Sequence, residues 1–271
     1  MNKMEENTII TGEAKEQLKK LDEKIVDCVV TSPPYFNLRN YQNDGQIGHE
    51  KTVKEFISNL CDIFDDVKRV LKDKGTVFVV IGDSYGPDKS LFMVPELFAL
   101  EMKRRGWILR NEIIWSKINP KPSSVKDRFT VSHEKIFFFT KSSKYYFEQV
   151  MVPSKEKQDF AITGNYDKST DSYKSVLRKP TGKKNCRTVW RKTISSDGTT
   201  HCATYPEGLI HAPIMAGCPE EGIVLDPFMG SGTTGVVALK LGRKFYGIEL
   251  NDTYKIAAEN RIKQVMDYYH I

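Results

Sequence analysis

The sequence predicts an α/β fold with a mostly parallel sheet of roughly seven strands. Short apolar runs rich in β-branched and aromatic residues alternate along the chain with amphipathic stretches of helical length. A glycine-rich turn follows one of these runs and opens one of these stretches, as in nucleotide-binding folds. The length of 271 residues is enough to bury a full hydrophobic core.

Six runs are expected to be strands: IVDCVV at 25–30, TVFVVIG at 76–82, ILRNEIIW at 108–115, KIFFFT at 135–140, GIVLD at 222–226 and KFYGIEL at 244–250. Three stretches between them are expected to be helices. The clearest covers 52–75, where apolar residues keep helical spacing and Gly75 is expected to end the helix. The other two cover 232–244 and 254–269.

The composition is that of a globular protein, with 39% hydrophobic and 28% charged residues. No stretch approaches the roughly 20 apolar residues that span a bilayer, and the first residues do not resemble a signal peptide, so a cytoplasmic protein without membrane contact is expected. The five cysteines include no C-x-x-C pair. They are expected to be free thiols, mostly buried, with no disulfide framework and no metal site.

Positive charge is concentrated in one segment. The whole chain carries a net charge of +6, whereas residues 153–192 contain eleven lysines and arginines against four acidic residues. Residues 150–200 are therefore interpreted as a small basic insertion outside the sheet, between a first half at 1–149 and a second half at 201–271. The insertion is a candidate for docking on DNA phosphates, and a solvated run of charge is the alternative.

The glycine-rich turn has the spacing Gly230-x-Gly232-x-x-Gly235, and Glu249 ends the strand that follows. Such a turn exposes backbone amides at a helix amino terminus, and an acid after the next strand can accept hydrogen bonds from ribose hydroxyls. Two ligands fit this pattern, a nicotinamide dinucleotide and S-adenosylmethionine. Because Asp226 would repel a pyrophosphate and attract an amino group and a sulfonium, S-adenosylmethionine is favoured.

The aromatic ring of Phe228 would also favour a sulfonium. The hydroxyls of Ser231, Thr233 and Thr234 stand where a methionine carboxylate could meet the helix amino terminus. A glycine-rich turn that binds nothing is the alternative.

A second motif, TSPPY at 31–35, follows the first predicted strand. Pro33 and Pro34 remove two backbone donors and stiffen the loop, which therefore presents acceptors. The Ser32 hydroxyl and the Pro33 carbonyl could accept hydrogen bonds from an NH₂ group while Tyr35 stacks on the attached ring. A nucleobase has this chemistry, and a plain turn that ends the strand is the alternative. Because sites in parallel sheets collect beyond the carboxyl ends of strands, this loop and the Gly230 turn are expected to share one crevice.

TSPPY together with DPFMGSGTT resembles the amino-methyltransferases of DNA, which methylate cytosine N4 or adenine N6. The motif order resembles the permuted β group of that family, and the likeness covers most of the chain outside about 150–185. The resemblance implies a Rossmann-like methyltransferase fold and S-adenosylmethionine as cofactor, with S-adenosylhomocysteine as product. It also implies double-stranded DNA as substrate and a cognate restriction endonuclease as genetic partner.

The resemblance carries roles onto matching residues. The catalytic set is Ser32, Pro33, Pro34 and Tyr35. The cofactor-binding set is Asp226, Pro227, Phe228, Gly230, Ser231, Gly232, Thr233, Thr234 and Glu249. The family segment matching 201–206 lines the amino-acid end of the cofactor, and this chain has Tyr205 where several relatives have lysine. Asp83 either faces the base or caps a turn, and residues 39–41 are candidates for a lid.

The residues and the resemblance exclude some alternatives and leave others open. Methylation of cytosine C5 is excluded because none of the five cysteines follows a proline, as that reaction's nucleophile does in its family. The resemblance implies cytosine N4 rather than adenine N6, because family members with Ser at the first position of the motif, as at Ser32, are more often cytosine enzymes, whereas Asp is commoner in adenine enzymes. A nicotinamide-dependent oxidoreductase would leave TSPPY unexplained. A monomer and a homodimer remain equally open.

Overall fold

A computed structural model of the chain describes residues 6–38, 46–153, 161–167, 172–178, 182–194 and 205–270. The chain divides into two compact units, one formed by Met1–Glu148 with Thr188–Ile271 and the other by Gln149–Arg187. None of the helices in the described ranges is long and apolar enough to cross a membrane.

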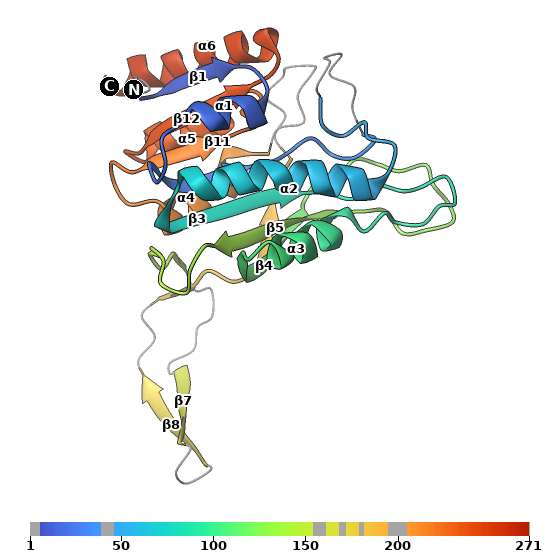
Figure 1. The fold of residues 1–271 in the computed structure, drawn as a ribbon. Coiled ribbons are helices and arrows are strands. Elements are labelled where there is room, and N and C mark those ends of the chain that lie inside the picture. Colours follow the sequence, from blue (N-terminus) through green and yellow to red (C-terminus); the bar gives the residue numbers. More distant parts are fainter. Residues whose placement is uncertain are drawn as a thin grey trace. The chain divides into compact units, whose positions relative to one another are not determined.

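The larger unit is built on an eight-stranded sheet with the order β1-β12-β11-β2-β3-β5-β4-β10 (Figure 1). Its strands are β1 Thr8–Thr11, β2 Val26–Thr31, β3 Leu71–Ile81, β4 Ile108–Lys117, β5 His133–Thr140, β10 Val189–Lys192, β11 Ile223–Asp226 and β12 Lys244–Glu249. Only the two pairs that involve β5 are antiparallel, and the other five pairs are parallel. The predicted α/β class and mostly parallel sheet are confirmed.

Helices cover both faces of this sheet. They are α1 Ala14–Lys20, α2 Val53–Val70, α3 Val94–Arg104, α4 Glu207–Gly217, α5 Thr233–Lys240 and α6 Asp252–Tyr269. One core contains buried side chains of α1, α2 and α3, such as Leu18, Phe56 and Phe98. The other contains side chains of α4, α5 and α6, such as Leu209 and Val236. The larger unit therefore has the three layers expected of a doubly wound fold.

The end of α2 differs from the prediction. The helix begins with a capping box between Thr52 and Glu55, but it ends at Val70, five residues before Gly75. The chain passes directly into β3 at Leu71, so Gly75 lies within this strand. A Cβ at Gly75 would lie 2.5 Å from Leu71 Cδ1, so this glycine is explained by close packing rather than by helix termination.

Two strands lie outside the predicted set. The edge strand β1 is only four residues long, and only Ile9 is buried in it. At the other edge, β10 pairs with β4 although it lies inside the segment 150–200, which was expected outside the sheet. The basic residues around Val189 and Trp190 obscured the short apolar signal of this strand. The sheet thus has eight strands, close to the roughly seven that were expected.

The smaller unit consists of antiparallel pairs. Strand β6 Met151–Pro153 pairs with β9 Lys183–Asn185, and β7 Ala161–Asp167 pairs with β8 Ser172–Arg178. Two-stranded pairs of this kind bury little apolar surface by themselves.

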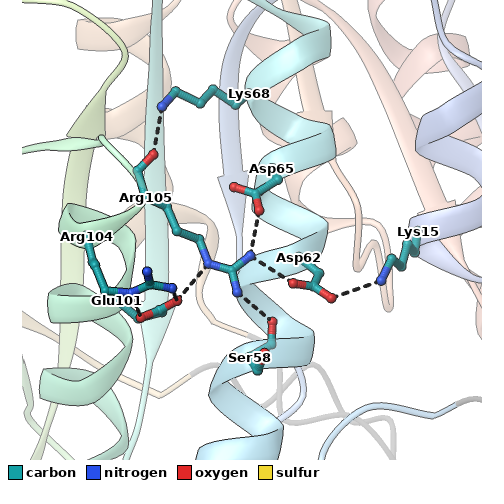
Figure 2. A network of polar contacts seen from close by, with 8 residues as sticks. All are labelled: Lys15, Ser58, Asp62, Asp65, Lys68, Glu101, Arg104 and Arg105. Atoms are coloured by element: carbon teal, nitrogen blue, oxygen red, sulfur yellow. Dashed lines mark hydrogen bonds and ion pairs between the residues drawn. The ribbon is translucent and has the colours of Figure 1, made fainter.

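A cluster of ion pairs joins the helices on the α2 side of the sheet (Figure 2). Arg105, which follows α3, donates to Glu101 of α3 and to Asp62 and Asp65 of α2 at 2.5–2.8 Å. Asp62 also pairs with Lys15 of α1 at 3.0 Å. The Arg105 side chain is only 14% exposed, so this Arg105 cluster is a partly buried junction of three helices.

Candidate functional site

The two motifs identified in the sequence follow neighbouring strands. β2 and β11 are parallel and hydrogen-bonded, with Val29 opposite Leu225. TSPPY begins at the last residue of β2, and the DPF segment begins at the last residue of β11. Both loops therefore leave the sheet at its carboxyl edge, where sites of parallel α/β folds collect.

Asp226 connects these two loops. Thr31 Oγ1 donates to Asp226 Oδ1 at 2.6 Å, across 195 residues of sequence. The backbone N–H of Phe228 donates to the same oxygen at 3.0 Å, while the hydroxyls of Tyr205 and Thr234 donate to Oδ2. The carboxyl group thus accepts four hydrogen bonds and ties β2, β11 and α5 together.

Burial sets the electrostatics of Asp226. The side chain is 1% exposed, and this burial raises its pKa even though the surrounding donors act in the opposite direction. Burial also raises the pKa of Tyr205 well above its ordinary value. Both Asp226 oxygens accept hydrogen bonds from the protein, so this carboxyl group fixes the positions of the two loops. The attraction of its charge for a cationic ligand stays a prediction.

The glycine-rich turn is held by Glu249 at the end of β12. Gly230 and Gly232 adopt φ angles of 53° and 81°, in the left-handed region that glycine tolerates best. The backbone N–H of Gly230 donates to Glu249 Oε2 at 2.7 Å, and that of Asn251 donates to Oε1 at 2.8 Å. Glu249 is 8% exposed, and burial raises its pKa.

The hydroxyls of the turn are buried, and a cation that was not predicted from the sequence lies beside them. Arg261 of α6 donates through Nη1 to the Ser231 carbonyl at 2.7 Å and to Ser231 Oγ at 2.9 Å. The same nitrogen lies 3.3 Å from Thr233 Oγ1. A guanidinium at a helix amino terminus makes this corner suitable for an anion. In the sequence, only the position of Arg261 in the last predicted helix could have indicated that it belongs to the site.

In the TSPPY loop, Pro33 is buried, while Ser32, Pro34 and Tyr35 are half-buried. The Tyr35 hydroxyl donates to Glu134 Oε2 at 2.8 Å. The Ser32 hydroxyl lies 3.5 Å from the Tyr35 oxygen, at the outer limit of a hydrogen bond. The hydroxyl of Ser32 is thus loosely held, whereas Tyr35 is anchored firmly.

The anchor of Tyr35 comes from the neighbouring strands. Glu134 of β5 also forms a short ion pair with Lys117 at the end of β4. One side of the Tyr35 ring packs on Gly82, where an added Cβ would lie 2.7 Å from Tyr35 Cε2. Glu134 and Lys117 were not predicted, because nothing local marks them as partners of a residue about 100 positions away.

Phe36 fixes the loop to the core behind it. Its ring is buried and packs against Phe56 and Phe92, with ring centroids 5.5 and 5.1 Å apart. Ser84 Oγ donates to the Phe36 carbonyl at 3.0 Å. This packing fixes the backbone of the TSPPY loop, so the backbone acceptors of the loop have defined positions.

Asp83 has the capping role that was one of its two interpretations. Its carboxylate accepts hydrogen bonds from the backbone N–H groups of Met93 and Val94, each at 3.1 Å, and from that of Ser84 at 2.9 Å. These contacts stabilise the start of α3. The candidate lid at 39–41 and residues 201–204 lie outside the described residues.

Cysteine and metal chemistry have no support in the described parts of the chain. Cys28, Cys61 and Cys218 are buried free thiols, as expected, and burial raises the pKa of Cys28 and of Cys61 to about 12. Thiols with such pKa values are poor nucleophiles at neutral pH. No group of three potential metal ligands is found among the residues that the structure describes.

A family model described as DNA methylase, N6_N4_Mtase, matches residues 26–260. The chain belongs to this family of DNA methylases. The match includes both motifs and the strands that carry them, and it leaves the nicotinamide-dependent oxidoreductase without support.

Relatives of this DNA methylase support the assignment over nearly its whole length. The type II methyltransferase M.SmaI of Serratia marcescens is 40% identical over 94% of this chain and 90% of its own length. M.Cfr9I of Citrobacter freundii is 38% identical over 94% of this chain and 87% of its own length. The chain is therefore a DNA methyltransferase similar to those of type II restriction-modification systems.

Solved structures agree with the fold of this methylase. The cytosine-N4-specific PvuII DNA methyltransferase superposes with a TM-score of 0.70 at 18% identity, covering 97% of this chain and 91% of that one. A putative DNA modification methylase of Thermus thermophilus, complexed with S-adenosyl-L-methionine, gives 0.66 at 25% identity with 95% of both chains covered. The Rossmann-like methyltransferase fold is confirmed.

Proposed function

We propose that this DNA methylase transfers a methyl group from S-adenosylmethionine to the N4 amine of a cytosine in a short double-stranded recognition sequence. The observation that carries the proposal is the hydrogen bond of 2.6 Å between Thr31 and Asp226. It joins the loop suited to an NH₂ group to the turn suited to an adenosine and a methionine. Two substrates bound there would meet at one edge of the sheet.

The residues around the glycine turn fit S-adenosylmethionine. Glu249 can accept hydrogen bonds from ribose hydroxyls in addition to those from Gly230 and Asn251, since each carboxylate oxygen has two lone pairs. Arg261 and the amino terminus of α5 offer positive charge to the methionine carboxylate. The half-buried ring of Phe228 is available to the sulfonium. S-adenosylmethionine supplies the activated methyl group.

The TSPPY loop fits the base. A base in a duplex cannot reach the cofactor, so it must leave the stack and bind against the Tyr35 ring. The Ser32 hydroxyl and the Pro33 carbonyl then accept hydrogen bonds from the two N–H groups of the amine. These bonds aim the nitrogen lone pair at the methyl group, and transfer proceeds by direct displacement without a covalent enzyme intermediate.

The choice of cytosine rests on Ser32 and on the cytosine-N4 specificity named for the PvuII structural neighbour. Adenine N6 presents the same amine beside a ring nitrogen and is the alternative. The proposed DNA-docking region is the basic segment 150–200. Most of this segment belongs to the smaller of the two units, Gln149–Arg187. The support for it is its excess of lysine and arginine, which suits phosphate contacts.

The test is expression in a host without DNA methylases, followed by nucleoside mass spectrometry and single-molecule sequencing of plasmid DNA. N4-methylcytosine at one short sequence is expected. Detection of N6-methyladenine instead would show that the target base is adenine, and the proposed roles of the site residues would be unchanged. Plasmid without either modified base, from cells that contain folded protein, would overturn the proposal.

A further inference from the structure

A long loop between β4 and β5 lies at the edge of the sheet that carries the site. It covers residues 118–132 and begins directly after Lys117. It ends just before His133 and Glu134, so the Lys117–Glu134 ion pair closes its base. Because Glu134 accepts the hydrogen bond from Tyr35, the base of this β4–β5 loop contacts the loop proposed to hold the flipped base.

The β4–β5 loop has the composition of a DNA-contacting surface. It carries Lys121, Lys126 and Arg128 against one acidic residue, Asp127. Phe129 is 96% exposed, the most exposed of the large hydrophobic side chains in the described part of the chain. Phe129 therefore offers a whole phenyl ring to a binding partner, and covering this ring with an apolar surface would be favourable.

Two neighbouring residues just before Phe129 connect the β4–β5 loop to the loop after β3. The Arg128 guanidinium lies over the Tyr85 ring, 3.5 Å from its centroid. Asp127 pairs with Lys89 at 2.7 Å. Tyr85 and Lys89 belong to the loop after β3, which begins with the glycine that packs against Tyr35. Figure 1 shows these two loops running side by side where β3 ends. Phe129 is therefore exposed on a supported loop.

We propose that the β4–β5 loop binds DNA beside the target base and that Phe129 enters the base stack when the target base leaves it. Lys121 and Lys126 contact the flanking phosphates. Phe129 lies five residues from Glu134, a span of at most roughly 17 Å, so it can reach the vacated position while the base binds at Tyr35. This inference rests on the proposed function of the site.

The energetics of base flipping give Phe129 its role. Extruding a base removes its stacking and pairing interactions, which costs a few kcal/mol. Apolar side chains inserted between base steps stabilise distorted DNA in other proteins, because they replace part of the lost stacking. The ring of Phe129 supplies an apolar face of this kind, and its removal should make flipping less favourable without affecting the cofactor.

The test compares two synthetic duplexes that contain the recognition sequence mapped on plasmid DNA, one fully paired and one with the target base mispaired. A mispaired base is easier to extrude. For Phe129→Ala, kcat/KM on the paired duplex is expected to fall roughly tenfold or more, and the loss should shrink to less than about threefold on the mispaired duplex. Phe129→Leu, which keeps an apolar side chain, should recover most of the activity.

Tyr268→Ala is the matched control, because it removes another strongly exposed aromatic ring, at the end of α6. It should leave both duplexes unaffected. The double variant Lys121→Ala, Lys126→Ala should reduce the slope of log K against log salt concentration by about 1.8, the value for two phosphate contacts.

Equal losses on the paired and mispaired duplexes, or unchanged activity of Phe129→Ala, would overturn the inference while wild-type methylation upholds the proposed function. A change of oligomeric state in Phe129→Ala, measured by light scattering with flipping unaffected, would assign the ring to a contact between copies instead. Absence of methyl transfer by the wild-type protein would overturn the proposed function and this inference together.

Discussion

The pKa values of acidic residues are shifted in opposite directions in two regions of the molecule. In the Arg105 cluster, hydrogen bonds from Arg104 and Arg105 lower the pKa of Glu101 to about 2. At the carboxyl edge of the sheet, burial raises the pKa of Asp226 and of Glu249, and neither forms an ion pair within the described ranges. The first region is complete without a ligand, whereas the second contains ionisable groups that a cation would stabilise.

The two kinds of acidic residue serve different purposes in the fold. Charges that the protein neutralises by itself hold helices together, and their loss affects stability. Buried acids held only by neutral donors are costly for the protein to ionise, and such groups are commonest at functional sites. Variants in the two regions should therefore separate stability from activity.

The largest expected effect is at the TSPPY loop. Ser32→Ala and Tyr35→Ala should each lower kcat for methyl transfer by roughly 100-fold or more, because they remove an acceptor for the amine and the stacking surface for the base. Incorporation of labelled methyl groups into plasmid DNA measures this loss. Titration calorimetry with S-adenosylmethionine should give unchanged affinity, and retained transfer would argue against the assignment of this loop.

Next is the loss of cofactor binding at Asp226. Asp226→Ala is expected to weaken S-adenosylmethionine binding by about 100-fold or more, since the turn loses the carboxyl group that holds Thr31 and Thr234. Asp226→Asn keeps the size of the side chain and removes only its charge, so it distinguishes loss of the charge from disruption of the fold. Glu101→Ala in the Arg105 cluster is the control and should change the affinity less than about twofold. Unchanged calorimetric affinity in both Asp226 variants would contradict the prediction.

Arg105→Ala should have the opposite signature. It leaves Glu101, Asp62 and Asp65 facing one another without their shared cation, so the free energy of unfolding should fall by about 1–3 kcal/mol. Urea denaturation measures this change. The affinity for S-adenosylmethionine should stay the same, and a stability equal to wild type would show that solvent screens these pairs completely.

The smallest effect concerns pH. The lowered pKa of Glu101 stabilises the fold above the ordinary glutamate pKa, and this contribution is lost as pH falls from about 4.3 towards 2. Glu101→Gln should therefore cost about 1 kcal/mol at pH 7 and almost nothing near pH 2. For Asp226 and Glu249 the pH dependence of stability has the opposite sign, because burial raises their pKa values. Their contribution to the free energy of unfolding is largest below the ordinary carboxyl pKa and falls as pH rises through the raised pKa. Denaturation curves at several pH values would detect the Glu101 window, and a pH-independent difference would contradict it.

Local patterns predicted the six main strands of the sheet, three of its helices and the adjacency of the two motifs. Local patterns did not predict β10, because this strand is short and surrounded by basic residues. They also placed the end of α2 too late, because β3 begins directly after the helix and Gly75 lies within this strand. The partners within the site could not be predicted from sequence. Thr31 meets Asp226 and Tyr35 meets Glu134 only because the sheet order brings distant strands together.

The position of β2 in the sheet also has a consequence for synthesis on the ribosome. β2 pairs with β3, made soon after it, and with β11, made near the end of the chain. At roughly 5–20 residues per second, about ten to forty seconds pass between the synthesis of Thr31 in β2 and that of Asp226 in β11. Throughout this interval one edge of the future catalytic strand is unpaired, and the methylase cannot modify DNA until its final strand has been translated.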